Sequence, residues 1–308
     1  MAADWLKNLA RVNLPVYRLK SDSASIIYTG YSSIKKHYFA RMMLGSDYRS
    51  TFIGRKWYHN VPGLVGRKGA DIVVCEISPM ALDYFMNCDG YIIPEWTTVI
   101  INIDRSLEEI CSKSVSNLKD VIRRIRKHNL TYEVLDDEES FKNFYDRMYL
   151  PYISKRHGEE AWIEEIDEIL KSKASPLLLA VKEDGNLVGS AVFSISNESL
   201  YLLRLGLLEG NDDYRKHGVI GAFYYFGILE GQKAGCKKVN LGGTRPFLSD
   251  GLTKYKISLG AEFIEKLSPS KEYLWLGINE KSENARKFLE NNQFVHVDKD
   301  FRLVRSST

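Results

Sequence analysis

Side chains that could stabilise or move charge during a group transfer lie between residues 204 and 256. Lys256 offers a compact ammonium donor, and its neighbour Tyr255 offers a phenol. Glu209 could act as a base through a water molecule. Arg204 could contact a substrate. Together these residue types could stabilise a developing negative charge and supply or accept a proton.

A glycine-bearing turn precedes the most apolar helix that the sequence predicts. It reads Arg215-Lys-His-Gly218, and Gly221 follows shortly after. The start of a helix can hold a phosphate through backbone N–H groups and the helix dipole. The alternative is that a buried helix start needs small residues for packing. The sequence leaves both interpretations open.

The elements that must position these residues form one continuous run. Three strands, 177–182, 187–195 and 200–208, are separated by turn-forming segments such as Glu183-Asp-Gly-Asn186. A helix over 214–229 is apolar almost all round and must be buried. A short strand, 238–241, comes next, and a helix over 251–260 ends at a glycine.

This run resembles the GNAT acyltransferase core, and most closely its FemAB-like and BioF2-like (CelD-like) branch. The resemblance covers roughly residues 103 to 263. It is carried by four segments: Val181-Lys-Glu-Asp-Gly-Asn-Leu-Val-Gly189, Arg215-Lys-His-Gly218, Asn240-Leu-Gly-Gly-Thr244 and Gly251-Leu-Thr-Lys-Tyr-Lys-Ile-Ser-Leu-Gly260.

The resemblance implies an α/β protein of two GNAT-like halves, each a mixed, mostly antiparallel sheet flanked by helices. A degenerate N-terminal half would span 1–112 and a catalytic half 113–308. The tail 269–308 could complete the second half or pack back on the first.

The resemblance also implies roles for single residues. Lys256 would stabilise charge near the acyl carbonyl, and Tyr255 would protonate the leaving group. Two departures from the family pattern are Ile220, where a small residue is usual, and Leu259, where an aromatic is usual. We expect Lys256 to keep its charge in water, so that its loss changes stability little. The residues that would hold the cofactor are Arg215, Lys216, Gly218, Gly221, Gly243 and Thr244.

Basic residues suggest a phosphate-bearing partner. The first 70 residues hold twelve Lys/Arg against three acidic residues, a net charge of +9, whereas the rest of the chain sums to −6. A predicted helix around 118–128 carries Arg123 and Arg124 on its polar face, and arginine forks match phosphate oxygens. The alternative is that both are ordinary solvated surfaces.

Composition excludes several classes of protein. The longest apolar stretches fall short of a membrane span, and no signal peptide is recognisable, which predicts a cytoplasmic protein. The four cysteines and six histidines are scattered without metal-ligand spacing, so we predict no metal site.

We also expect an irregular segment at 45–69, and a helix at 138–150 that ends before Pro151.

The sequence therefore predicts an N-acyltransferase that uses acyl-CoA or aminoacyl-tRNA as donor. The acceptor would be an amine of a small molecule or peptide, and tRNA is a possible partner. The alternative is a non-catalytic module that keeps the fold to bind a nucleotide or RNA. The sequence names neither the acceptor nor the oligomeric state.

Overall fold

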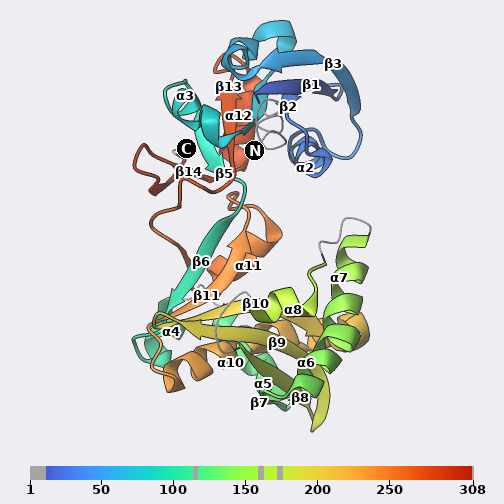
Figure 1. The fold of residues 1–308 in the computed structure, drawn as a ribbon, viewed down its shortest axis with the longest axis vertical. Coiled ribbons are helices and arrows are strands. Elements are labelled where there is room, and N and C mark those ends of the chain that lie inside the picture. Colours follow the sequence, from blue (N-terminus) through green and yellow to red (C-terminus); the bar gives the residue numbers. More distant parts are fainter. Residues whose placement is uncertain (1–11, 114–116, 159–162, 172–175, 307–308) are drawn as a thin grey trace. The chain divides into compact units, whose positions relative to one another are not determined.

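The chain folds into two compact units. The structure is a computed structural model that describes residues 12–113, 117–158, 163–171 and 176–306 (Figure 1). Unit 1 combines residues 1–97 with 244–253 and 264–308, and unit 2 combines 98–243 with 254–263. The chain thus passes between the units four times rather than once near residue 112. The tail belongs to the unit that contains the N-terminal strands.

Unit 1 is built on an eight-stranded mixed sheet. Its strand order is β15-β14-β5-β13-β4-β2-β1-β3. Neighbouring strands are antiparallel except β2 and β4, which run parallel. The strands are β1 (Asn13–Lys20), β2 (Ser25–Thr29), β3 (Arg49–Trp57), β4 (Ile72–Ile77), β5 (Tyr91–Pro94), β13 (Tyr273–Ile278), β14 (Val295–Val297) and β15 (Leu303–Arg305).

Both faces of the unit 1 sheet are covered. Alternate residues of a strand point to opposite faces, so Val73 and Cys75 of β4 belong to one apolar cluster and Ile72 and Val74 to another. The first cluster includes residues of α3 (Leu82–Met86), and the second includes residues of α2 (Ser33–Leu44) and α12 (Glu283–Asn291). Each of the last two helices begins with a serine cap, Ser32 or Ser282.

Unit 2 is built on a seven-stranded sheet with the order β12-β6-β11-β10-β9-β8-β7. β7 to β10 form antiparallel neighbours, whereas β10 and β11 pair in parallel. The strands are β6 (Thr97–Asn102), β7 (Leu130–Leu135), β8 (Pro176–Glu183), β9 (Asn186–Ser196), β10 (Ser199–Leu207), β11 (Lys238–Thr244) and β12 (Glu262–Phe263).

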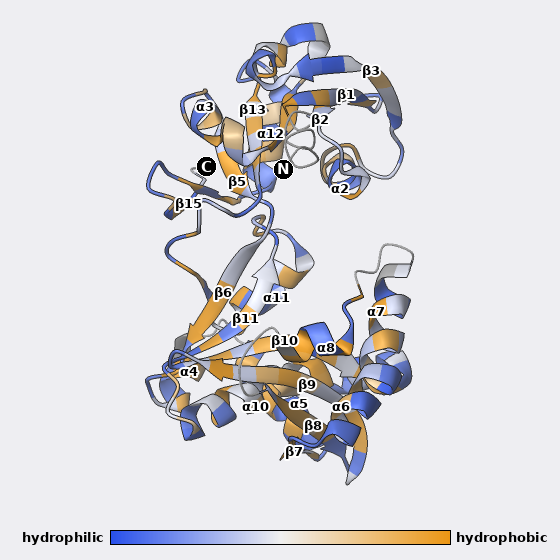
Figure 2. Ribbon diagram, in the orientation of Figure 1, coloured by the Kyte–Doolittle hydropathy of each residue, from blue (hydrophilic) through white to orange (hydrophobic). Residues whose placement is uncertain are grey.

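Two layers of helices cover the unit 2 sheet. The sheet itself is apolar, and the hydrophobic strands β6 and β9 stand out in Figure 2. One face packs against α5 (Asn117–Lys127) and α10 (Val219–Lys233), and Phe193 and Phe223 lie in this core. The opposite face packs against residues of α6 (Glu138–Phe144), a π-helical turn (Tyr145–Tyr149) and α8 (Ile166–Lys171). The remaining helices are α4 (Leu107–Lys113), α7 (Leu150–His157), α9 (Asp212–His217) and α11 (Gly251–Ser258).

The expected α/β class, with two mixed and mostly antiparallel sheets flanked by helices, is confirmed. Two local predictions are wrong. Residues 49–57 form an edge strand, β3, rather than irregular chain, and most of its side chains are exposed, so no apolar alternation marks it. Helical structure also continues through Pro151. The π-helical turn ends at Tyr149, and Pro151 lies in the first turn of α7, where no N–H donor is needed. None of the described helices is long and apolar enough to cross a membrane.

Candidate functional site

The strand pair β10 and β11 stays together over only part of its length. Parallel pairing joins Ser199–Tyr201 to Lys238–Asn240, although both strands continue beyond these residues. Gly242 adopts a left-handed conformation (φ 77°), and its N–H donates to the Asn240 side chain at 2.8 Å. This local turn gives the Gly242 amide a side-chain partner within β11 itself. The sequence Asn240-Leu-Gly242 therefore interrupts the sheet at its parallel junction.

Lys256 lies at the end of this interruption. Its Nζ donates to the carbonyl oxygen of Gly243 at 2.7 Å, so α11 is fastened to the end of β11. Only 4% of Lys256 is exposed. The expectation that its charge lies in water is wrong, because the helix that carries it packs its side chain inward. The expectation that loss of Lys256 would change stability little therefore no longer follows.

Three tyrosines gather in the apolar core of unit 2. The rings of Tyr224 and Tyr255 lie 6.0 Å apart, and Tyr152 belongs to the same apolar cluster. Burial raises the pKa of Tyr255 to about 12, and it also raises the pKa of Tyr224. Tyr255 therefore stays protonated at neutral pH. Tyr152 and Tyr224 did not stand out in the sequence, because apolar positions in helices commonly carry tyrosine.

The glycine-bearing turn packs against α5. Gly218 is left-handed (φ 100°) and separates α9 from α10. A methyl group there would lie 2.9 Å from the Cβ of Arg124, and one at Gly221 would lie 2.6 Å from Val121. At Gly221 the added methyl would also come within 3.2 Å of the Tyr255 hydroxyl. Close packing by α5 thus accounts for both glycines, as one of the two interpretations of the sequence expected.

The predicted phosphate-binding arginines are already paired. Arg123 and Arg124 both bind Asp120, at 2.6 and 2.9 Å, and the hydrogen bond from Arg123 is the main cause of the lowered pKa of Asp120. Arg124 also donates to the Lys216 carbonyl at 2.8 Å, which fastens α5 to the turn.

The two cations of α9 are paired within their own helix. Lys216 binds Asp213 at 2.8 Å, and Arg215 lies 3.5 Å from Asp212. Acidic partners thus accompany each cation near the turn.

Three other candidate residues are held by partners other than Lys256. Glu209 is exposed and left-handed (φ 52°), and it pairs with Arg147 at 3.0 Å. Arg204 pairs with Glu164. Thr244 is fully buried in unit 1, where its hydroxyl is hydrogen-bonded to that of Thr253.

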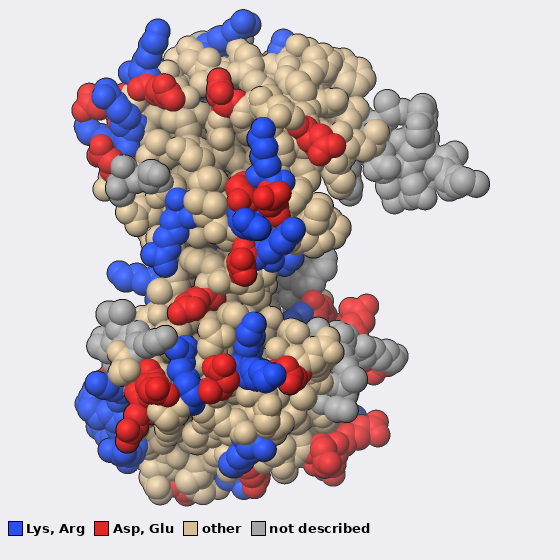
Figure 3. Space-filling view, turned by 90° about the vertical axis from the view of Figure 1, so that its left-hand side faces the viewer, with Lys and Arg blue, Asp and Glu red and all other residues tan. Residues whose placement is uncertain are grey.

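Charges of both signs share one face of the molecule. On the face in Figure 3, basic and acidic side chains are intermingled rather than separated. In unit 1, Lys35 pairs with Glu95 and Glu272, at 2.6 and 2.8 Å, which reduces the free positive charge of the N-terminal region.

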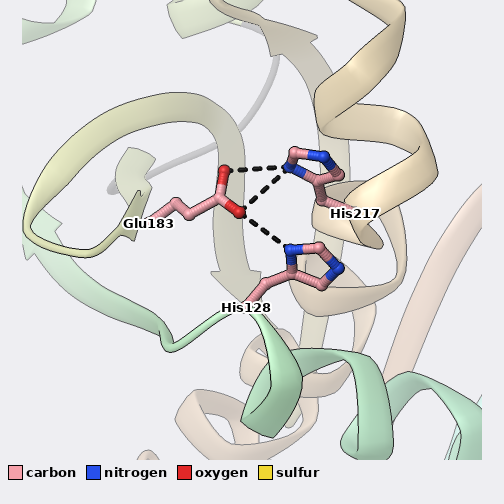
Figure 4. Close-up of side chains that lie close together, drawn as sticks. All are labelled: His128, Glu183 and His217. Atoms are coloured by element: carbon pink, nitrogen blue, oxygen red, sulfur yellow. Dashed lines mark hydrogen bonds and ion pairs between the residues drawn. The ribbon is translucent and has the colours of Figure 1, made fainter.

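The fold also assembles a cluster that the sequence did not predict. His128, Glu183 and His217 come from three separate elements, and both imidazoles contact the same carboxylate (Figure 4). Their sequence separations of 55 and 34 residues hide them from any search for local metal spacing.

Comparison with known proteins gives limited information. No family model matches the chain, and no curated protein matches it. Among solved structures, the chain is similar to the C-terminal domain of a putative lysylphosphatidylglycerol synthetase from Agrobacterium fabrum, with 13% identity, 90% of this chain and 84% of that chain covered, and a TM-score of 0.43.

Two further structures are similar to the same extent. L-PGS from Bacillus licheniformis is 12% identical, with 90% and 85% of the two chains covered and a TM-score of 0.41. FemX is 13% identical, with 86% and 84% covered and a TM-score of 0.44. Such low values assign neither an activity nor a substrate to this chain.

Proposed function

We propose that unit 2 transfers an acyl or aminoacyl group to an amine of a small molecule or peptide. The observation that carries the proposal is the interrupted β10–β11 junction with Lys256 at its end. An extended donor arm can hydrogen-bond to strand edges that do not bond each other, and the reacting carbonyl then lies near a fixed positive charge.

Lys256 and Tyr255 would divide the chemistry between them. The amine nitrogen attacks the carbonyl carbon, and negative charge develops on the carbonyl oxygen. The positive charge of Lys256, held in place through Gly243, stabilises that oxyanion. The bond to the leaving group then breaks as the Tyr255 hydroxyl gives that group a proton, and the proton released by the attacking nitrogen restores the phenol. Glu209 is given no part, since it is exposed and paired with Arg147.

Two observations favour an oxygen ester, as in aminoacyl-tRNA, over an acyl-CoA thioester. The turn that would hold a pyrophosphate is packed against Arg124 and Val121. In addition, a phenol with a pKa of about 12 protonates a strongly basic alkoxide more readily than a thiolate, whose conjugate thiol has a pKa of about 8.5. Tyr255 is therefore better matched to an oxygen leaving group.

The test is single-turnover transfer from labelled aminoacyl-tRNA and, separately, from labelled acetyl-CoA to a panel of amines. Lys256→Met should reduce transfer by on the order of 10²- to 10³-fold, the usual effect of removing one oxyanion-stabilising group. Lys254→Met is the matched control, because Lys254 is an exposed lysine of the same helix.

The outcomes separate the candidate functions. Transfer from neither donor, combined with salt-sensitive binding of RNA or a nucleotide, would replace the enzyme with a binding module. Transfer from acetyl-CoA alone would refute the preference for an oxygen ester. Equal activity of Lys256→Met and the wild type would refute the role of Lys256.

A further inference from the structure

Three potential metal ligands converge where three elements of unit 2 end. His128 directly follows α5, Glu183 is the last residue of β8, and His217 is the last residue of α9. The Nδ1 atom of His128 lies 2.9 Å from Glu183 Oε1, and that of His217 lies 3.0 Å from the same oxygen. Figure 4 shows both rings turned toward this one carboxylate.

The spacing of the three groups suits a single ion. The possible ligand atoms all lie within 4.8 Å of one another. Tetrahedral Zn²⁺ holds nitrogen and oxygen ligands about 2.0–2.2 Å away, which places the ligand atoms roughly 3.3–3.5 Å apart. The two contacts to Glu183 would widen by only a few tenths of an ångström, a movement within reach of one side-chain rotation.

The two rings lie side by side next to the carboxylate. The imidazoles of His128 and His217 are stacked, with centroids 4.3 Å apart and planes 16° from parallel. Both Nδ1 atoms face Glu183, and the rings must tilt toward each other for both lone pairs to reach one ion. The side chains are 20%, 16% and 35% exposed for His128, Glu183 and His217, so an ion can enter a site that is already partly removed from water.

The surrounding charges do not oppose a cation. The basic side chains of the adjacent turn are paired with carboxylates: Arg124 shares Asp120 with Arg123, Lys216 binds Asp213 and Arg215 faces Asp212. A second acid, Asp184, follows Glu183 and accepts a hydrogen bond from Asn129 at 3.1 Å.

We propose that His128, Glu183 and His217 bind one divalent transition-metal ion, with Zn²⁺ the best match to two imidazoles and one carboxylate. Three protein ligands leave a fourth position for water. The ion would join segments that are 55 and 34 residues apart in sequence, and it would fix the α9–α10 turn, since His217 precedes Gly218. This inference is independent of the transferase proposal.

Metal binding would move a proton on each ring. An ionised carboxylate only accepts hydrogen bonds, so each metal-free neutral imidazole must carry its proton on Nδ1 to bond Glu183. A metal ion needs the lone pair of Nδ1, so the proton must then lie on Nε2. The change of tautomer is visible in the imidazole ¹⁵N resonances and distinguishes ligation at this site from adventitious binding elsewhere.

The experiment uses the full chain, produced without a histidine tag and treated with a chelator. Titration with ZnCl₂ in a calorimeter should give one ion per chain, and the ¹⁵N resonances of two histidines should change tautomer. Loss of an outer-shell partner typically weakens metal binding 10- to 100-fold. His217→Asn, His128→Asn and Glu183→Gln each remove a direct ligand, so each should weaken binding by at least about a hundredfold.

The matched control is His59→Asn, which replaces an exposed histidine of unit 1 and should leave the affinity unchanged. Wild-type affinity in the Glu183→Gln variant would overturn the proposal. So would zinc binding to the wild type with both rings still protonated on Nδ1. The second measurement uses only the wild type, so it decides the question even where a variant fails to fold.

Discussion

Replacing Lys256 tests whether a buried lysine both stabilises unit 2 and serves its chemistry. The side chain is 4% exposed, and its ammonium donates to Gly243 at 2.7 Å. Lys256→Ala removes three buried methylenes, worth about 0.8 kcal/mol each, together with one hydrogen bond of about 1 kcal/mol. Relief of the buried charge offsets part of this loss. We therefore expect the free energy of unfolding to fall by about 2–3 kcal/mol.

Lys256→Met separates the two roles. Methionine keeps most of the buried volume, and water can reach the carbonyl oxygen of Gly243 because that residue is exposed. The loss of stability should therefore be about 1 kcal/mol or less, while transfer falls as described above. Unfolding by urea, followed by circular dichroism, measures the stability of both variants.

The exposed neighbour Lys254 provides the reference. Lys254→Ala should change the free energy of unfolding by less than about 0.5 kcal/mol, as is usual for a surface substitution. If Lys256→Ala unfolds at the same urea concentration as Lys254→Ala, the side chain is solvated and the argument from burial fails. If Lys256→Met is as unstable as Lys256→Ala, the hydrogen bond rather than the packed stem dominates.

Two further substitutions test a close backbone approach and the raised pKa of Tyr255. Gly206→Ala places a methyl group 2.4 Å from the backbone of Met148 in the π-helical turn, so it should lower the free energy of unfolding by about 1–3 kcal/mol in urea. Gly251→Ala is the control, because its methyl group meets nothing within 4 Å and should not destabilise the protein. Equal urea midpoints for the two variants would contradict the close approach at Gly206. Burial raises the pKa of Tyr255 to about 12, so the stability from its protonated phenol is complete below its unfolded pKa and is lost as pH rises toward 12. Tyr255→Phe should reduce the alkaline loss of stability measured by pH-dependent unfolding, and an unchanged alkaline profile would show that Tyr255 titrates normally.

The sequence predicted the elements whose signals are local. The turn Glu183-Asp-Gly-Asn186 set the hairpin of β8 and β9, where Asp184 and Gly185 both adopt positive φ. Ser32 caps α2, and its side chain accepts a hydrogen bond from the backbone N–H of Lys35. Asp250 caps α11 by accepting hydrogen bonds from the backbone N–H groups of Leu252 and Thr253.

Features that depend on distant contacts could not be predicted. β3 joins the sheet only through β1, and its exposed side chains carry no alternating pattern. The burial of Lys256 depends on where β11 ends, and the histidine cluster depends on how α5 meets the α9–α10 turn. In each case the deciding neighbour lies in another element, so a single segment contains no signal for it.

The Asn240–Gly242 turn lowers the free energy that an extended molecule needs to enter the sheet. In a continuous sheet, an extended molecule enters between two strands only after it breaks the backbone hydrogen bonds that join them. Here the pairing of β10 and β11 stops after Tyr201 and Asn240, and the amide of Gly242 is already satisfied by a side chain. The two strands are thus already unpaired at this point in the folded chain. Binding energy that would otherwise separate two strands remains available to orient whatever enters.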